Sequence, residues 1–207
     1  CLETLAARLR ARSVLPRGAR AHGRQGMLLM PANSWILEGV RRAEPADRPG
    51  LLAIVEASNN FSGVEKACAV ELIDLALRAV GSAAPDYRLL IAPGPQCAPV
   101  GYICFGEANF ARGTFDLYWI AVHPEARRRG LGRRLLSAFE AEARSLGARL
   151  LLITTTARED YLAAHATYRA ADFTVAARIP NYYAPGEDQL IFGKQLTPPS
   201  ASPPPRG

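Results

Sequence analysis

Apolar residues along the chain recur at two spacings. Residues 64–79 and 131–146 place them three and four positions apart, which predicts two helices. Shorter apolar runs, bounded by Pro, Gly or His-Pro, are typical of buried strands and occupy residues 87–92, 100–106, 115–122 and 150–154. The chain is therefore predicted to be an α/β protein whose helices and strands share one core.

Further elements are expected on both sides of this region. Asp47, ahead of Pro49, is a suitable N-cap for a helix over residues 51–56. A strand, helix and strand in the order 115–122, 131–146 and 150–154 predict a right-handed parallel crossover. The remaining predictions are a first strand at 35–40, a helix at 161–170, and strands at 173–179 and 189–196.

Length and composition favour one folded domain. The chain has 207 residues, 49% of them apolar, which is enough for one sizeable core. We expect the domain over residues 35–196, between a basic arm at 1–34 and a Pro-rich tail at 197–207 that cannot pack. No apolar run approaches the roughly 18 residues of a membrane-spanning helix, so no membrane partner is expected.

The net charge of +6 comes mostly from the arm. Six arginines and one acidic residue, Glu3, precede Met27, so the rest of the chain is close to neutral. The arm could bind RNA or be an Arg-rich transit peptide. Residues 1–26 could equally lie upstream of the true start, since both methionines follow them, and Cys1 at the first position suggests a fragment. Nucleic-acid binding is not expected of the folded part.

The four cysteines form no CxxC pair and have no His at metal-ligand spacing. We therefore expect neither a metal site nor a disulfide framework. Cys68 lies in a helical pattern and Cys104 in a strand pattern, where buried free thiols are common. This use of cysteine fits the reducing cytoplasm, where we expect the protein to be.

The most specific motif is Arg127-Arg128-Arg129-Gly130-Leu131-Gly132, which follows a predicted strand and opens a predicted helix. A helix start presents unpaired backbone N–H groups and the positive end of the helix dipole, both of which suit an anion. The two glycines allow close approach of the backbone. The arginines, with Arg133 and Arg134 after them, suit a polyanionic pyrophosphate.

Residues 120–136, which contain this turn, resemble the R/Q-x-x-G-x-G/A signature of the GNAT superfamily of N-acetyltransferases. Residues 179–188 resemble segments of its ribosomal-protein alanine acetyltransferase branch and of uncharacterised bacterial members. The resemblance extends over roughly residues 35–196. It implies a GNAT-like mixed central sheet of about six to seven strands flanked by about four helices, and acetyl-CoA as cosubstrate without a metal. It also implies a cofactor-binding set of Ile120, Ala121, Val122, Arg127, Arg128, Arg129, Gly130, Leu131, Gly132, Arg133 and Arg134.

The same resemblance suggests catalytic residues for direct attack of an amine on the thioester. Tyr168 matches the family's Y-x-x-x-G-F motif, with Asp172 in place of the glycine, and is the expected general acid. The base is Asp116 or a water relay. Asp116 corresponds to a Glu of histone acetyltransferases, and strand alternation predicts that it shares a face with Ile120 and Val122. Tyr161 stands where many relatives have a CoA-contacting Asn.

Two segments are candidate walls for the acceptor. Residues 179–188 break the strand pattern and combine prolines, adjacent tyrosines and acids that suit a cationic amine. The turn at 59–62 is the other candidate, by family analogy. Together they provide the predicted substrate-binding residues Asn60, Phe61, Tyr182, Tyr183 and Glu187.

Two functions remain open at this point. The first is an acetyl-CoA-dependent N-acetyltransferase acting on a primary amine of a small molecule or a protein. The second is a non-catalytic domain that binds or senses acyl-CoA. A homodimer is compatible with either function.

Overall fold

A computed structural model describes residues 39–82 and 85–196. Its helices are α2 (Arg48–Glu56), α3 (Gly63–Arg78), α4 (Leu131–Ser145) and α5 (Leu162–Arg169). Its strands are β1 (Arg41–Arg42), β2 (Arg88–Pro93), β3 (Pro99–Glu107), β4 (Thr114–Val122), β5 (Leu150–Thr156), β6 (Thr174–Ala184) and β7 (Glu187–Gln195). The predicted mixed α/β fold is confirmed. The expected arm and tail lie outside the described residues.

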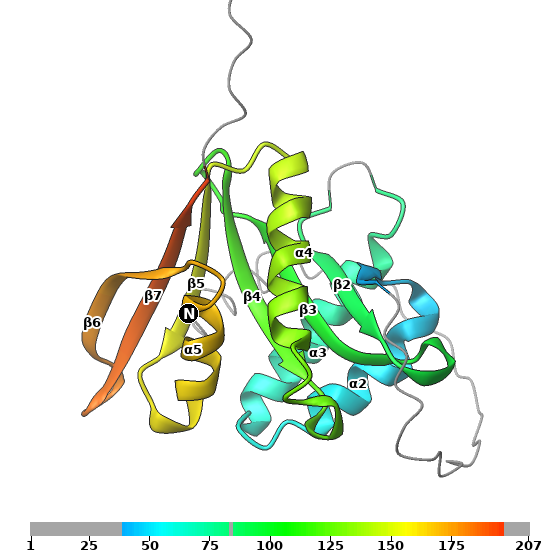
Figure 1. Cartoon of the computed structure of the whole chain (residues 1–207), viewed down its shortest axis with the longest axis horizontal. Coiled ribbons are helices and arrows are strands. Elements are labelled where there is room, and N and C mark those ends of the chain that lie inside the picture. Colours follow the sequence, from blue (N-terminus) through cyan, green and yellow to red (C-terminus); the bar gives the residue numbers. More distant parts are fainter. Residues whose placement is uncertain (1–38, 83–84, 197–207) are drawn as a thin grey trace, which may run out of the picture.

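The strands form one sheet in the order β1-β2-β3-β4-β5-β7-β6. Only β4 and β5 are parallel neighbours among the described strands, as the predicted crossover requires. Figure 1 shows α4 and α5 on one face of the sheet and α2 and α3 on the other. Each face therefore has its own hydrophobic core.

The core under α4 explains the sharp amphipathic pattern of that helix. Leu131, Leu135, Phe139 and Ala143 are buried at helical spacing and pack on the inner strands. Phe139 contacts Phe105 of β3 with ring centroids 4.8 Å apart. The arginines of α4 therefore point away from the core, where they remain accessible to a ligand.

Strands β4 and β5 are paired over only part of their length. The parallel ladder joins residues 114–117 to 150–153, and Figure 1 shows the two strands diverging beyond it. The divergence follows a β-bulge in β4, where Cys104 of β3 pairs with Trp119 and Phe105 pairs with Leu117. Tyr118 is thus the extra residue, and the sheet opens from this point toward the end of β4.

The segment at residues 179–188 was expected to break the strand pattern, and this expectation is wrong for its first half. Strand β6 continues to Ala184, with an irregular register against β7 after Ile179. The turn is at Pro185-Gly186, where Gly186 has a φ of +82°. The adjacent tyrosines are thus part of a β-hairpin, which holds them more rigidly than a loop would.

The expected first strand lies mostly outside the described residues, and the expected cap of the first helix differs from the structure. Residues 35–38 lie outside the described part of the chain, and the first described strand is Arg41–Arg42. Asp47 precedes α2, yet its side chain does not cap that helix. It accepts hydrogen bonds from two nitrogens of Arg41, each at 2.8 Å, and from the Glu44 backbone N–H at 2.7 Å. It therefore joins β1 to the start of α2.

Replacing Asp47 by Asn is expected to lower the free energy of unfolding by about 1 to 3 kcal/mol, since it breaks charge-assisted bonds at a buried carboxylate. Burial alone would raise the pKa of Asp47, but the bonds from Arg41 and Glu44 outweigh it and hold the pKa below its usual range. The stabilisation is therefore present above roughly pH 4 and is lost as the pH falls through the folded-state pKa.

Urea unfolding at neutral pH and at roughly pH 3 measures this difference. The gap between wild type and variant should narrow in acid. The control is Glu56→Gln, whose carboxylate is exposed and 3.5 Å from Lys66, and which should change stability by no more than about 0.5 kcal/mol. A gap that is the same at both pH values would contradict the assignment.

Candidate active site

Two cavities lie along the opening between β4 and β5. The larger, of about 890 Å³, runs from the turn before α4 to the inner side of α5. The smaller, of about 340 Å³, lies between the diverging strands and the β6–β7 hairpin. Four residues line both cavities: Phe61, Ile120, Tyr161 and Tyr168. The cavities therefore meet at these four side chains.

The large cavity begins at the predicted anion-binding turn. Gly130 has a φ of +74°, a left-handed conformation that favours glycine, and it precedes the first residue of α4. At Gly132 a Cβ atom would lie 3.3 Å from the Thr167 methyl carbon, so a glycine there lets α4 approach α5 closely. The turn thus exposes the N-terminal N–H groups of α4 to the cavity.

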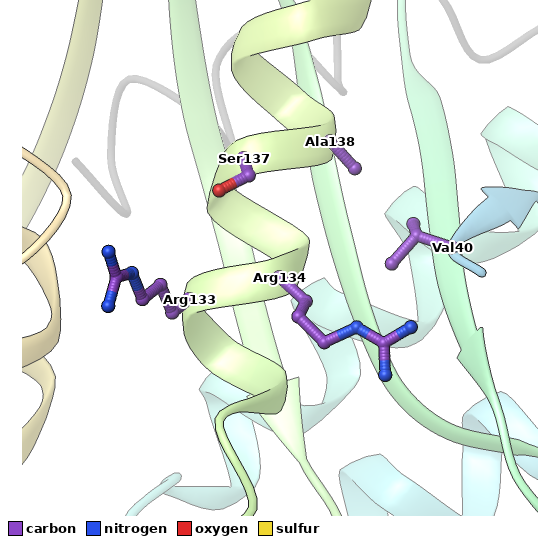
Figure 2. A pocket seen from close by; sticks show the side chains of 5 residues that line it. All are labelled: Val40, Arg133, Arg134, Ser137 and Ala138. Atoms are coloured by element: carbon purple, nitrogen blue, oxygen red, sulfur yellow. The ribbon is translucent and has the colours of Figure 1, made fainter. Parts of the chain in front are cut away.

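The arginines of the motif do not all face the large cavity. Arg127, Arg128 and Arg133 line it, and the Arg127 Nε donates to the Val122 carbonyl oxygen at 3.1 Å, which ties the turn to the end of β4. Arg129 lines neither cavity. Figure 2 shows Arg134 pointing toward Val40 and Arg133 pointing away from it. Both arginines line a separate open pocket beside Val40, and Arg134 does not line the large cavity.

The outer part of β4 forms the wall opposite α5. Ile120, Ala121 and Val122 line the large cavity, as the sequence predicts for cofactor-binding residues. The ladder to β5 ends at Leu117, so in the described sheet the backbone groups of these three residues on that side have no strand partner. Such N–H and C=O groups require hydrogen-bond partners, which a bound ligand can provide.

Tyr168 lies where the two cavities join. Its side chain is only 5% exposed and packs against Phe192 of β7, with ring centroids 5.4 Å apart. Burial raises the pKa of Tyr168 well above its usual range, so the phenol stays protonated at physiological pH. This state is the one that a general acid needs.

The predicted position of Asp116 on the cavity face is wrong. The bulge at Tyr118 reverses the alternation of β4, so Phe115 and Leu117 share the α4 face with Ile120 and Val122. Asp116 therefore points to the opposite face, and it lines neither cavity. The geometry gives its predicted role as base no support.

The small cavity is aromatic and acidic. Of the predicted substrate-binding residues, Phe61, Tyr183 and Glu187 line it, Asn60 lines the large cavity, and Tyr182 lines neither, although its ring packs against Tyr183. Sequence reasoning missed several lining residues, which come from α3, β4, the end of β5 and the segment after it: Glu65, Tyr118, Trp119, Thr156 and Arg158. For Glu65, the S-x-x-E capping box at Ser62 was a usable signal.

Thr156 and His165 hold the end of β5 in place. His165 is buried, and its Nε2 donates to the Thr156 carbonyl oxygen at 3.0 Å. Burial lowers the pKa of His165, so the ring is favoured in its neutral form. His165 therefore neither faces solvent nor binds a ligand in either cavity. The Thr156 hydroxyl donates to Glu187 Oε1 at 3.0 Å, which ties the β6–β7 hairpin to β5.

Comparison with known proteins identifies the family. The sequence model described as "Acetyltransferase (GNAT) family" matches residues 64–173, which include the glycine-arginine turn and Tyr168. The chain belongs to the GNAT acetyltransferase family. This GNAT protein is therefore an acetyltransferase, and acetyl-CoA is its cosubstrate. The large cavity, with its arginines and helix N-terminus, fits that polyanionic molecule.

Solved structures of other family members agree with this result. A GNAT-family protein from Desulfovibrio desulfuricans is 31% identical, with a TM-score of 0.69 over 76% of this chain and 98% of its own. A ribosomal-protein-alanine N-acetyltransferase from Brucella melitensis is 25% identical, with a TM-score of 0.59 over 76% and 99%. The yncA protein of Salmonella typhimurium, solved with its cofactor acetyl-CoA, shares the fold at 23% identity and a TM-score of 0.60, over 78% and 95%. No curated protein matches the chain.

The described residues contain neither a metal-ligand cluster nor a membrane-spanning helix. No group of three or more His, Cys, Asp or Glu side chains there could hold a metal ion. None of the helices in that part of the GNAT protein has the length and apolar character needed to cross a membrane.

The Arg128→Gln variant is expected to bind coenzyme A about tenfold more weakly, because a cation facing the large cavity is removed. Its affinity for pantetheine, which lacks the pyrophosphate, should not change. Isothermal titration calorimetry with both ligands measures the difference. Arg78→Gln removes an exposed arginine at the end of α3 and should bind both ligands as wild type does. An equal loss for coenzyme A and pantetheine would show that Arg128 does not contact the pyrophosphate.

Proposed function

We propose that this GNAT protein transfers the acetyl group of acetyl-CoA to a primary amine of a small molecule or a protein. The observation that carries the proposal is the junction of the two cavities at Tyr168 and Ile120. A cosubstrate in the large cavity and an acceptor in the small one would meet only there. The amine would then attack the thioester, and the thiolate would leave, beside the protonated phenol of Tyr168.

The charges of the two cavities support different ligands. Arg127, Arg128 and Arg133 line the large cavity, which suits the phosphates of the cosubstrate. Glu65 and Glu187 line the small cavity. Its one arginine, Arg158, is bound to Asp160 at 2.7 and 3.0 Å, which offsets its positive charge. The small cavity is therefore acidic and suits a cationic amine.

Each wall of the junction has a proposed task. The backbone of Ile120, Ala121 and Val122, which pairs with β3 but has no β5 partner, holds the pantetheine arm and donates to the thioester oxygen, where negative charge develops. Tyr168 gives its proton to the departing thiolate. Tyr161, whose hydroxyl donates to the Asn60 carbonyl oxygen at 3.4 Å, links α5 to the turn before α3 and separates the two ligands.

The proposal also includes the cellular compartment in which the protein acts. The described cysteines Cys68, Cys97 and Cys104 have free thiols, and burial raises the pKa of Cys68 to about 11, so this thiol stays protonated and unreactive. Free thiols support a reducing compartment, and we place the reaction in the cytoplasm.

Replacing Tyr168 by Phe is expected to lower kcat by at least about 100-fold, because the thiolate then leaves without a proton donor. Affinity for coenzyme A and the thermal midpoint should stay close to wild type, since the ring keeps its packing against Phe192. A thiol-release assay with a panel of primary amines, together with calorimetry, measures all three quantities. In wild type the activity should persist to pH values above the usual tyrosine pKa of about 10.

The rival function gives a different result in the same assay. A domain that only binds acyl-CoA would show coenzyme A affinity without release of thiol for any amine. Tyr168→Phe would then change nothing measurable. Turnover by wild type, lost in the variant, separates the enzyme from the binding module.

A further inference from the structure

Three carboxylates lie at or beside the acidic cavity, and two of them have structural tasks. Glu65 accepts the Ser62 backbone N–H at 2.8 Å in the capping box of α3. Asp188 accepts the Arg178 Nε and, at 2.9 Å, the Asn181 backbone N–H, which brace the β6–β7 hairpin. The third carboxylate, Glu187, takes part in neither arrangement.

Glu187 has a fixed position, yet only one of its two carboxylate oxygens has a hydrogen-bond partner among the described residues. Its Oε1 accepts the Thr156 hydroxyl at 3.0 Å, while the described part of the chain offers no hydrogen-bond donor to its Oε2. Thr156 is itself fixed by His165 through its carbonyl oxygen. The carboxylate is therefore positioned at the cavity wall with one oxygen available to a ligand.

Among the described residues that line the cavity, the cation is Arg158, which interacts electrostatically with Glu187 but forms no hydrogen bond to it. The guanidinium of Arg158 forms two bonds to Asp160, which lines the large cavity. Aromatic side chains line the same cavity, among them Tyr183 and Trp119, and the latter packs edge-on against Phe61 with ring centroids 5.0 Å apart. Aromatic faces attract the ammonium form of an amine, which the carboxylate can then deprotonate.

We propose that Glu187 is the general base of the reaction and that its acceptors are protonated alkylamines. The assignment rests on the proposed function. Glu187 takes the role of base that was predicted for Asp116, whose side chain the bulge turns away from the cavities. The base thus comes from the start of β7, at the end of a hairpin, and is aligned by a hydroxyl of β5.

The proton and bond changes balance as follows. Glu187 takes one proton from the ammonium group, directly or through one water, and later releases it to solvent. The neutral nitrogen attacks the thioester carbon, so the C–N bond forms and the C–S bond breaks. Tyr168 protonates the thiolate and regains a proton from the nitrogen, which leaves a neutral amide and a free thiol.

The test uses two acceptors of the same carbon chain, 2-phenylethylamine and 2-phenylethylhydrazine. The assay is run at about pH 9, where the amine is still mostly cationic and the hydrazine, a weaker base by roughly two pKa units, is largely uncharged. Glu187→Gln keeps an oxygen that can accept the Thr156 hydroxyl. We expect kcat of this variant to fall at least about 100-fold with the amine and less than about tenfold with the hydrazine. If the panel finds a better amine, that amine and its hydrazine replace this pair.

Two further variants make the comparison specific. Glu65→Gln removes a charge from the same cavity and keeps the capping box, because Gln is also suitable at that position. It should raise KM for the cationic amine and leave kcat within about threefold of wild type. Asp116→Asn tests the earlier candidate for the base.

The outcomes separate the two levels of the proposal. If wild type acetylates no amine of the panel, the proposed function fails. If wild type is active and Glu187→Gln keeps the wild-type kcat with the amine, Glu187 is not the base. The same conclusion follows if the kcat of Glu187→Gln falls by the same factor with the amine and with the hydrazine. The assignment would also be overturned if kcat with the amine, but not with the hydrazine, fell in Asp116→Asn and did not fall in Glu187→Gln. Thermal midpoints and coenzyme A affinity, expected to match wild type, check the fold of each variant.

Discussion

The partial pairing of β4 and β5 is the constraint on which the site depends. The strands share a ladder of four residue pairs and then separate, after a single extra residue, Tyr118, in β4. Beyond that point the backbone of residues 120–122 has no β5 partner in the described sheet. An open ladder inside a sheet is costly unless a ligand or water takes the place of the missing strand. The unmet hydrogen-bonding capacity of this backbone therefore favours binding of an extended molecule that is rich in amide groups.

The same opening separates two chemical environments. On one side the N-terminus of α4 and its arginines favour phosphate, and on the other Glu187 and the aromatic side chains favour an ammonium group. Tyr168 stands between them, buried and protonated. In the proposed reaction, this arrangement would keep the oppositely charged groups of the two ligands apart until their reactive atoms meet at Tyr168.

Elements of regular periodicity could be predicted from local sequence. Helices α3 and α4 and strands β4 and β5 occur within about two residues of the predicted bounds, because hydrophobic spacing alone determines which face they bury. The turn before α4 could be predicted equally well, because Gly130 and the arginines lie within a few residues of one another. Strand β7 and the first half of β6 were predicted as well, but the continuation of β6 to Ala184 was not, because Pro180 and the irregular register after Ile179 leave no alternating pattern.

The sequence by itself determined the fold class, the glycine-arginine turn before α4 and the position of Tyr168, since each depends on residues close together in the chain. The tertiary structure decided which carboxylate reaches the cavity. Asp116 looked suitable by strict alternation, but one bulge, visible only in the register of β4 against β3, turns it to the other face. Glu187 comes to the cavity from 31 residues beyond Thr156, its hydrogen-bond partner. Contacts of that range follow from strand order and cannot be inferred from spacing.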